Sequence, residues 1–346
     1  MGRPPTLTQM PGRNGRAAGH GDHVSRPGRT VSGRRALGVI GLALAVLFLA
    51  VNLYVFSQQW RQRERLVADG LRRPQGVVWM PDDALVIAEA GEAGRPDSGR
   101  LTRAEAESGR QTILDKLPSD PSGGPSGIAR AANGSLLIVT GPCAGPRCAA
   151  LLGPDAAGEL VVQADLRARP GAGERARPWG LALGADGAAY VTDSGTGELL
   201  RIETGAAPPR ISRVAGFGEG AAPRGLAFGR DGALYVALFG AGSVVRVGPD
   251  GSVATVAGGL SEPIALGVDP EGRLLALEHA AGRLVRLDAA GGRPEVLSRD
   301  LDGPTGMAVA PDGRVYVTVR GLAADGRPGQ LLQVRRLGPI GPRRFV

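Results

Sequence analysis

A sixfold internal repeat constrains this chain more than any other feature of its 346 residues. Each copy opens with a proline, carries Gly or Ala two residues later, and places Asp, Asn or Glu eight residues after the proline. The six prolines are Pro74, Pro125, Pro178, Pro223, Pro263 and Pro304. Four copies carry Asn-Gly or Asp-Gly at the later point, which predicts a two-residue hairpin turn between two short strands.

Apolar runs within each copy predict four strands. In the fourth copy these runs lie at residues 225–228, 234–237, 244–247 and 253–256. Four strands per copy, repeated six times, are typical of an all-β, six-bladed β-propeller. The small residue two positions after each proline suits the crowded strand nearest the central axis.

The ends of the repeat region predict how the ring closes. The sixth copy has a third strand at residues 330–334, but the Gly- and Pro-rich segment that follows is poor strand material. We therefore expect the segment at residues 65–68 to supply the missing fourth strand, which removes the open edge. The predicted propeller spans residues 62–337, and residues 338–346 form a C-terminal tail.

An apolar segment precedes the repeats. Residues 36–56 contain no charged side chain and would span about 31 Å as a helix, close to the thickness of a bilayer core. Residues 36–57 are thus predicted to be a transmembrane signal anchor after a disordered basic tail at residues 1–35, and a cleavable signal peptide is the alternative. This predicts a single-pass protein of the cell membrane, with a cytoplasmic N-terminus and an extracytoplasmic propeller.

The charge distribution argues against a nucleic-acid partner. The formal net charge is +8, but residues 1–57 contribute +6 of it through seven arginines and one aspartate. The repeat region is therefore nearly neutral, and its sequence shows no basic stripe for a phosphate backbone.

Strand alternation predicts one functional face. The segments around the six prolines, here called the Pro loops, should lie on the same face as the residues 15 and 16 positions after each proline. The candidate ligand-binding residues of this Pro-loop face are Glu89, Thr140, Trp179, Asp193, Arg224, Phe239, Glu278 and Arg320. The opposite Asp-Gly face, built from regular turns, is not expected to carry a site.

Three carboxylates of this face suggest a metal. Glu89, Asp193 and Glu278 fall on alternate blades, and oxygen ligands of this kind suit Ca²⁺ or another divalent cation on the axis. Alternatively, each acid pairs with backbone amides or with arginines such as Arg224 and Arg320.

His279 is the candidate general base, because the other two histidines lie in the N-terminal tail. A hydrogen-bonded structural histidine is the alternative. Trp179 and Phe239 provide either an apolar wall for a ligand or packing between blades. Cys143 and Cys148 form a local disulfide if the domain is exported, and a redox-active pair is the alternative.

The phrases at residues 223–237 and 282–288 resemble six-bladed NHL-type propellers, a group that includes gluconolactonase-like, streptogramin-lyase-like and strictosidine-synthase-like proteins and quinone-dependent sugar dehydrogenases. The segments at residues 73–76, 88–91 and 124–128 resemble the bacterial ScyD/ScyE-type group. The resemblance implies a channel histidine and, in gluconolactonase-like proteins, a divalent ion, although the ligand motif of those lactonases is not recognisable here.

Two functions follow as hypotheses. The first is a propeller that binds a small molecule or a partner on its Pro-loop face without catalysis. The second is an enzyme, either a metal-dependent lactonase or lyase or a quinone-dependent sugar dehydrogenase. An axial cation, or a cofactor-sized pocket lined by Arg and His, would favour the enzyme.

Overall fold

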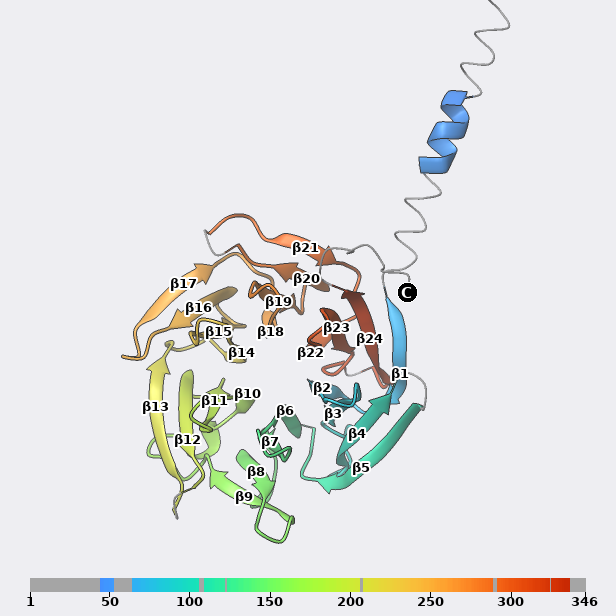
Figure 1. Ribbon diagram of the computed structural model, residues 1–346. Helices are drawn as coiled ribbons and strands as arrows, with labels where there is room; N and C mark the ends of the chain where they lie inside the picture. Colours follow the sequence, from blue (N-terminus) through green and yellow to red (C-terminus); the bar gives the residue numbers. More distant parts are fainter. Residues whose placement is uncertain are drawn as a thin grey trace, which may run out of the picture. The chain divides into compact units, whose positions relative to one another are not determined.

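Six four-stranded antiparallel sheets surround a central axis in the second of two units into which the chain divides, Gln59–Val346 (Figure 1). The computed structural model describes residues 44–52, 64–105, 109–121, 123–205, 208–288, 291–323 and 325–336. The all-β, six-bladed propeller predicted from the repeats is confirmed.

The first three blades follow one another along the chain. Blade 1 contains β2 (Pro74–Trp79), β3 (Leu85–Glu89), β4 (Gly99–Glu105) and β5 (Gly109–Leu117). Blade 2 contains β6 (Pro125–Arg130), β7 (Leu136–Thr140), β8 (Ala150–Pro154) and β9 (Leu160–Asp165). Blade 3 contains β10 (Pro178–Leu183), β11 (Ala189–Asp193), β12 (Glu198–Glu203) and β13 (Arg210–Gly216), after a short 3₁₀ turn at Gly173–Arg175.

The last three blades complete the ring. Blade 4 contains β14 (Pro223–Phe228), β15 (Leu234–Leu238), β16 (Ser243–Val247) and β17 (Val253–Ala257). Blade 5 contains β18 (Pro263–Val268), β19 (Leu274–Glu278), β20 (Arg283–Arg286) and β21 (Glu295–Ser298). Blade 6 contains β22 (Pro304–Val309), β23 (Arg314–Val319), β24 (Gly329–Arg336) and β1 (Arg65–Leu71).

The ring closes as the sequence predicted, because β1 pairs antiparallel with β24 as the outer strand of blade 6. Leu66 lies opposite Leu332, and Leu71 lies opposite Gly329. Leu71 is buried in a cluster with Leu331 and Tyr316, so the closing strand adds apolar burial as well as backbone hydrogen bonds.

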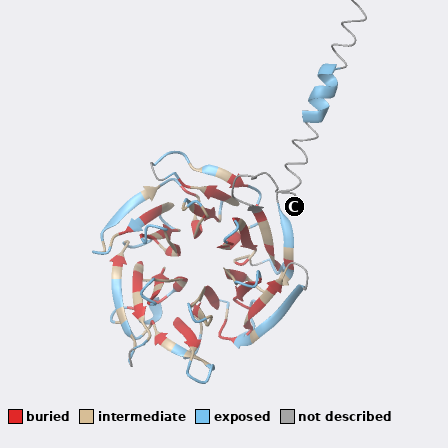
Figure 2. Cartoon of the chain, in the orientation of Figure 1, coloured by how far each residue is buried: buried red, intermediate tan, exposed pale blue. Residues whose placement is uncertain are grey.

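The first strands of neighbouring blades pack closely around the axis, which explains the small residue in each Pro loop. A Cβ added to Gly127 would lie 2.7 Å from the carbonyl oxygen of Trp179 in the next blade. Such a contact excludes any larger side chain unless the backbone moves. The burial pattern follows, with the inner three strands of the blades mostly buried and the outer strands largely exposed (Figure 2).

The predicted two-residue hairpin turn is wrong, because the Asp-Gly turns are three-residue loops. In blade 3 the Gly184 amide donates to the Ala188 carbonyl at 2.9 Å, and the Gly187 amide donates to the Gly184 carbonyl at 2.9 Å. Only Gly187 has a positive φ, at 77°, while Asp186 accepts a hydrogen bond from the Ala188 amide at 3.1 Å. The aspartate thus serves as a turn acceptor, and the glycine alone supplies the left-handed residue.

The predicted transmembrane anchor and membrane location are corrected by the structure. Helix is described at residues 44–52. Among the described residues no helix has the length and apolarity to cross a membrane. The rest of the predicted segment 36–57, the tail 1–35 and the C-terminal residues 338–346 lie outside the described residues.

Candidate functional site on the Pro-loop face

Each proline lies opposite the residue 15 positions later, which brings most of the predicted site residues to one end of the blades. Pro74 pairs with Glu89, Pro178 with Asp193, and Pro263 with Glu278. The geometry expected from strand alternation is therefore present in these blades. The predicted site residues fall into two groups. In the first, each acidic side chain pairs with an arginine, and the second is a cluster around an arginine that has no acidic partner among the described residues.

Glu89 belongs to the set with internal partners. It is fully buried at the end of β3, and both of its carboxylate oxygens accept from Arg100 on β4, at 2.8 and 2.9 Å. Thr102 and the backbone amide of Arg72 also donate to this carboxylate. The buried negative charge is thus neutralised by a bidentate arginine and has further donors.

Asp193 and Glu278 are bound in the same way in blades 3 and 5. Both are fully buried. Asp193 pairs with Arg169 and accepts from the backbone amide of Arg177 at 2.8 Å. Glu278 pairs with Arg283 and accepts from the Ser261 amide at 2.7 Å.

The three acids therefore do not fit a shared divalent cation. Each already has a positive partner from its own surroundings, whereas a metal site needs carboxylates that face one another. Across the part of the chain that the structure describes, no three His, Cys, Asp or Glu side chains group so as to hold a metal ion. The arginine partners Arg100 and Arg283 were missed from sequence, although each lies directly opposite its acid on the neighbouring strand.

A second group of predicted residues forms a compact aromatic–arginine cluster, which comprises Trp179, Arg224, Phe239 and His279. The Arg224 guanidinium carbon lies 4.3 Å from the centroid of the Trp179 ring and 3.5 Å from that of Phe239. The Phe239 ring lies 6.1 Å from the His279 ring, with 45° between their planes. Rings from blades 3 and 4 thus contact one guanidinium, and His279 of blade 5 lies beside the Phe239 ring.

Of the two roles expected for the aromatic residues, the structure shows the packing role. Trp179 and Phe239 are partly buried and pack against the apolar cluster that includes Ile264 and Leu277. Their other contact is the cation–π stacking with Arg224, which contributes on the order of 0.5–2 kcal/mol per pair. The rings therefore anchor the cluster to the core and hold the arginine in a fixed place.

Arg224 has an unusual electrostatic environment. Its Nε and Nη1 atoms are buried and have no hydrogen-bond partner. Burial lowers the pKa of Arg224 to about 10, and the charge of nearby Glu262 opposes that shift. A desolvated cation with unused donors is suited to receive an anionic group.

The hydrogen bond of His279 fixes its neutral tautomer. Its Nδ1 lies 2.8 Å from the carbonyl oxygen of Pro304. Because a carbonyl oxygen only accepts, Nδ1 must carry the hydrogen in the neutral ring. The lone pair of a neutral His279 is then on Nε2, the atom that a general base would use.

Two other predicted face residues stand outside this cluster. The Thr140 hydroxyl is buried and donates to the Arg147 carbonyl at 2.6 Å, so it stabilises its own loop. The Arg320 guanidinium donates to Asp302 at 2.7 Å on the rim of blade 6. Both residues have local structural partners.

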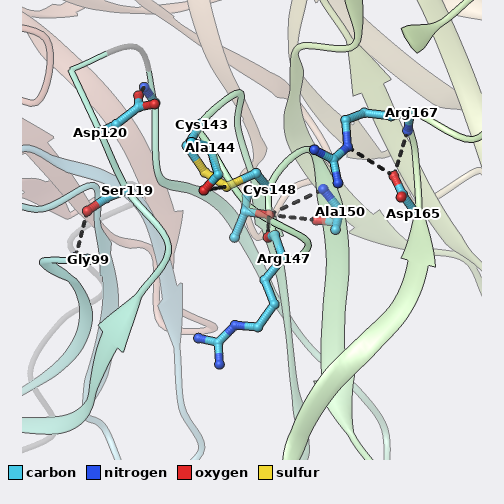
Figure 3. The surroundings of a disulfide bond; sticks show 12 residues. Gly99, Ser119, Asp120, Cys143, Ala144, Arg147, Cys148, Ala150, Asp165 and Arg167 are labelled. Carbon is cyan, nitrogen blue, oxygen red and sulfur yellow. Dashed lines mark hydrogen bonds and ion pairs between the residues drawn. A yellow bond between two sulfur atoms is a disulfide. The ribbon is translucent and has the colours of Figure 1, made fainter. Parts of the chain in front are cut away.

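Cys143 and Cys148 form a disulfide in the loop between β7 and β8 (Figure 3). Cys148 is fully buried. In the same loop Arg147 donates to the Lys116 carbonyl of blade 1 at 3.1 Å. The bridge therefore shapes a loop that contacts the neighbouring blade.

The central channel offers little space for a ligand. The central channel forms a cavity of about 80 Å³, lined by the residues that follow the prolines, including Gln75, Trp179 and Thr305. Pockets for small ligands commonly have about 300–1,000 Å³. The channel cavity is thus smaller than this range.

The Asp-Gly face is less uniform than expected. A hollow of about 800 Å³ lies there between blades 4 and 5, next to Arg273 and Arg286. Arg273 pairs with Asp269 at 2.8 Å, and Arg286 pairs with Glu295 at 2.6 Å. Both arginines thus have carboxylate partners, although the buried Nε of Arg286 has no hydrogen-bond partner and lies 3.4 Å from Asp269.

Comparisons with known proteins support the fold. No family model matches the chain, and no curated protein sequence matches it. Among solved structures, a luciferin-regenerating enzyme is 14% identical with a TM-score of 0.60, over 80% of this chain and 95% of the other. The chain shares the six-bladed propeller fold.

Two further propellers are enzymes with known reactions. A gluconolactonase from Xanthomonas campestris is 18% identical with a TM-score of 0.57, over 79% of this chain and 90% of the other. A catalytically inactive histidine-to-alanine variant of virginiamycin B lyase from Staphylococcus aureus, solved with quinupristin, is 15% identical with a TM-score of 0.55, over 79% of this chain and 99% of the other. The NHL-type resemblance to lyase and gluconolactonase propellers is confirmed for the fold.

Proposed function

We propose that this propeller binds a small molecule on its Pro-loop face, over the aromatic–arginine cluster, without transforming it. The observation that supports this most is the Arg224 guanidinium, which is stacked between Trp179 and Phe239 and has two buried nitrogens without acceptors. Buried polar groups without partners are rare in proteins, and a bound acceptor is one explanation for them. Four side chains from three adjacent blades offer a footprint that suits a small molecule better than a nucleic acid or a large protein.

The test uses the full chain and a native reporter. The chain has three tryptophans, so substituting Trp60 and Trp79 by Phe leaves Trp179 as the sole emitter. Small molecules released from the denatured protein would be identified by mass spectrometry and added back to this variant. We expect a saturable change in Trp179 emission.

Phe239→Leu should abolish that binding, whereas Phe228→Leu should not. Phe228 is the matched control, because it packs edge-on against Tyr190 at 5.2 Å, away from the cluster. If the released molecules bind equally to both leucine variants, or if Trp179 emission never responds, the site is not where we place it.

A second candidate function is catalysis with His279 as the general base. The observation that favours it is the Nδ1 contact with Pro304, which leaves the Nε2 lone pair of the neutral ring unused by that bond. Lyase and lactonase propellers share the fold. Quinupristin and a gluconolactone are the first substrates to test. Turnover by the natural chain that is lost in His279→Ala would contradict the non-catalytic proposal.

A further inference from the structure

Arg224 carries a positive charge that the repeat does not compensate. In blades 1, 3 and 5 the position 15 residues after the proline is Glu89, Asp193 or Glu278, and each of these acids has its own arginine. Blade 4 has Leu238 at this position, opposite Pro223. Within the described residues no ion pair involves Arg224, so the acid–arginine pairing of blades 1, 3 and 5 is missing here, as it is in blades 2 and 6, which have Thr140 and Val319 at the equivalent positions.

The stacking of Arg224 limits how a ligand can reach it. Trp179 and Phe239 cover the guanidinium, with ring centroids 4.3 and 3.5 Å from its central carbon. An anion must therefore approach along the edge of the guanidinium, where its N–H groups point. In-plane approach is the geometry in which a planar carboxylate forms two parallel hydrogen bonds.

The surrounding charges favour a single negative charge on the ligand. Arg224 supplies one positive charge, and Glu262 is near enough to influence it electrostatically. A second negative charge on the ligand would have no second arginine of the cluster to balance it. A dianion such as phosphate is therefore disfavoured relative to a monocarboxylate.

We propose that the aromatic–arginine cluster recognises a singly charged carboxylate through the edge of Arg224. This inference rests on the proposed function, since it names the ligand class of the same site. The carboxylate supplies the acceptors that Nε and Nη1 lack. Because these two nitrogens are buried, the side chain must shift slightly between its rings when the anion binds.

The experiment measures Trp179 emission in the full chain that lacks Trp60 and Trp79. Acetate and benzoate are the carboxylate probes, acetamide and benzamide are their neutral counterparts, and inorganic phosphate is the dianion. We expect saturable binding of the carboxylates, and binding of their amides or of phosphate that is at least about tenfold weaker, because hydrogen bonds between charged groups are stronger than those to neutral groups.

Substitutions then assign the effect to one side chain. Arg224→Gln should weaken carboxylate binding at least about tenfold. Arg224→Lys should retain part of it, because the charge stays while the planar fork is lost. Arg246→Gln is the matched control, since Arg246 borders the hollows of the Asp-Gly face and should not affect binding.

Three outcomes would overturn the inference. Amides that bind as tightly as carboxylates would show that the rings and not the charge recognise the ligand. Unchanged carboxylate binding in Arg224→Gln would place the anion elsewhere. An absence of any carboxylate response would mean that the two rings alone satisfy the guanidinium. In each case the molecules identified by co-purification still test the proposed function separately.

Discussion

Blades 1 and 4 place opposite charges on the same face and satisfy them differently. Glu89 of blade 1 is fully buried, with a bidentate arginine and a backbone amide as partners. Arg224 of blade 4 lies between two rings and has buried nitrogens with no acceptor. A closed ion pair is part of the framework, whereas a cation with unused donors can still bind something. Glu89 is therefore assigned to the structural framework, and Arg224 is a candidate for ligand binding.

Removing one member of the Glu89–Arg100 ion pair should change the free energy of unfolding more than any substitution of Arg224. Glu89→Ala leaves the guanidinium of Arg100, which is 14% exposed, without its carboxylate. We expect the free energy of unfolding to fall by about 3–5 kcal/mol, measured by urea denaturation. The double variant Glu89→Met with Arg100→Met is the control and should lose far less. A loss below 1 kcal/mol in Glu89→Ala would mean that this pair is not part of the framework.

Replacing Arg224 of blade 4 should raise the stability of the protein instead of lowering it. Arg224→Met removes the free-energy cost of burying a guanidinium whose hydrogen bonds are not made, about 1–3 kcal/mol. It also loses the cation–π stacking, about 0.5–2 kcal/mol. The methionine can still pack between the rings, so we expect a net gain of about 1 kcal/mol. Thermal denaturation measures it. A large destabilisation would instead assign Arg224 a structural role.

The stability gain of Arg224→Met should depend on pH. Burial lowers the pKa of Arg224 to about 10 from its ordinary value of 12.5, so the unfolded chain binds more protons between these values. The penalty for the charged arginine is therefore fully present below pH 10 and diminishes above it. The difference in unfolding free energy between the variant and the natural chain should shrink when measured just above pH 10. A constant difference would contradict the lowered pKa.

Metal removal should have the smallest effect. Since Glu89, Asp193 and Glu278 each have an arginine, we expect EDTA to leave the melting temperature unchanged. A Zn²⁺ or Ca²⁺ titration of the EDTA-treated protein is the control. A melting temperature that falls with EDTA and recovers only with Ca²⁺ would support the calcium site expected from the sequence.

Local sequence signals predicted the fold well, because each repeat carries its own turn and strand pattern. The position of the Asp-Gly turns and the small residue at Gly127 and its equivalents follow from short-range chemistry. The closing strand at Arg65–Leu71 could be predicted because the sixth repeat has no fourth strand of its own. The site was predicted only in part. Strand alternation placed Glu89 on the correct face, but its pairing with Arg100 depends on the register between β3 and β4.

The aromatic–arginine cluster was the hardest part to predict. Trp179, Arg224 and Phe239 were each assigned to the Pro-loop face, yet their contact depends on how blades 3 and 4 are rotated about the axis. No spacing within one repeat encodes that rotation. The predicted membrane anchor had a different outcome, since no helix among the described residues has the length and apolarity to cross a membrane.

The pairing of β1 with β24 has a consequence for biosynthesis. The strand that leaves the ribosome early must wait, unpaired, for a partner that is translated last. Blade 6 can therefore assemble only after the whole repeat region has been translated, so ring closure is a late step of folding. A chain that stalls before Gly329 would keep its first strand exposed and would be a ready substrate for chaperones or proteases.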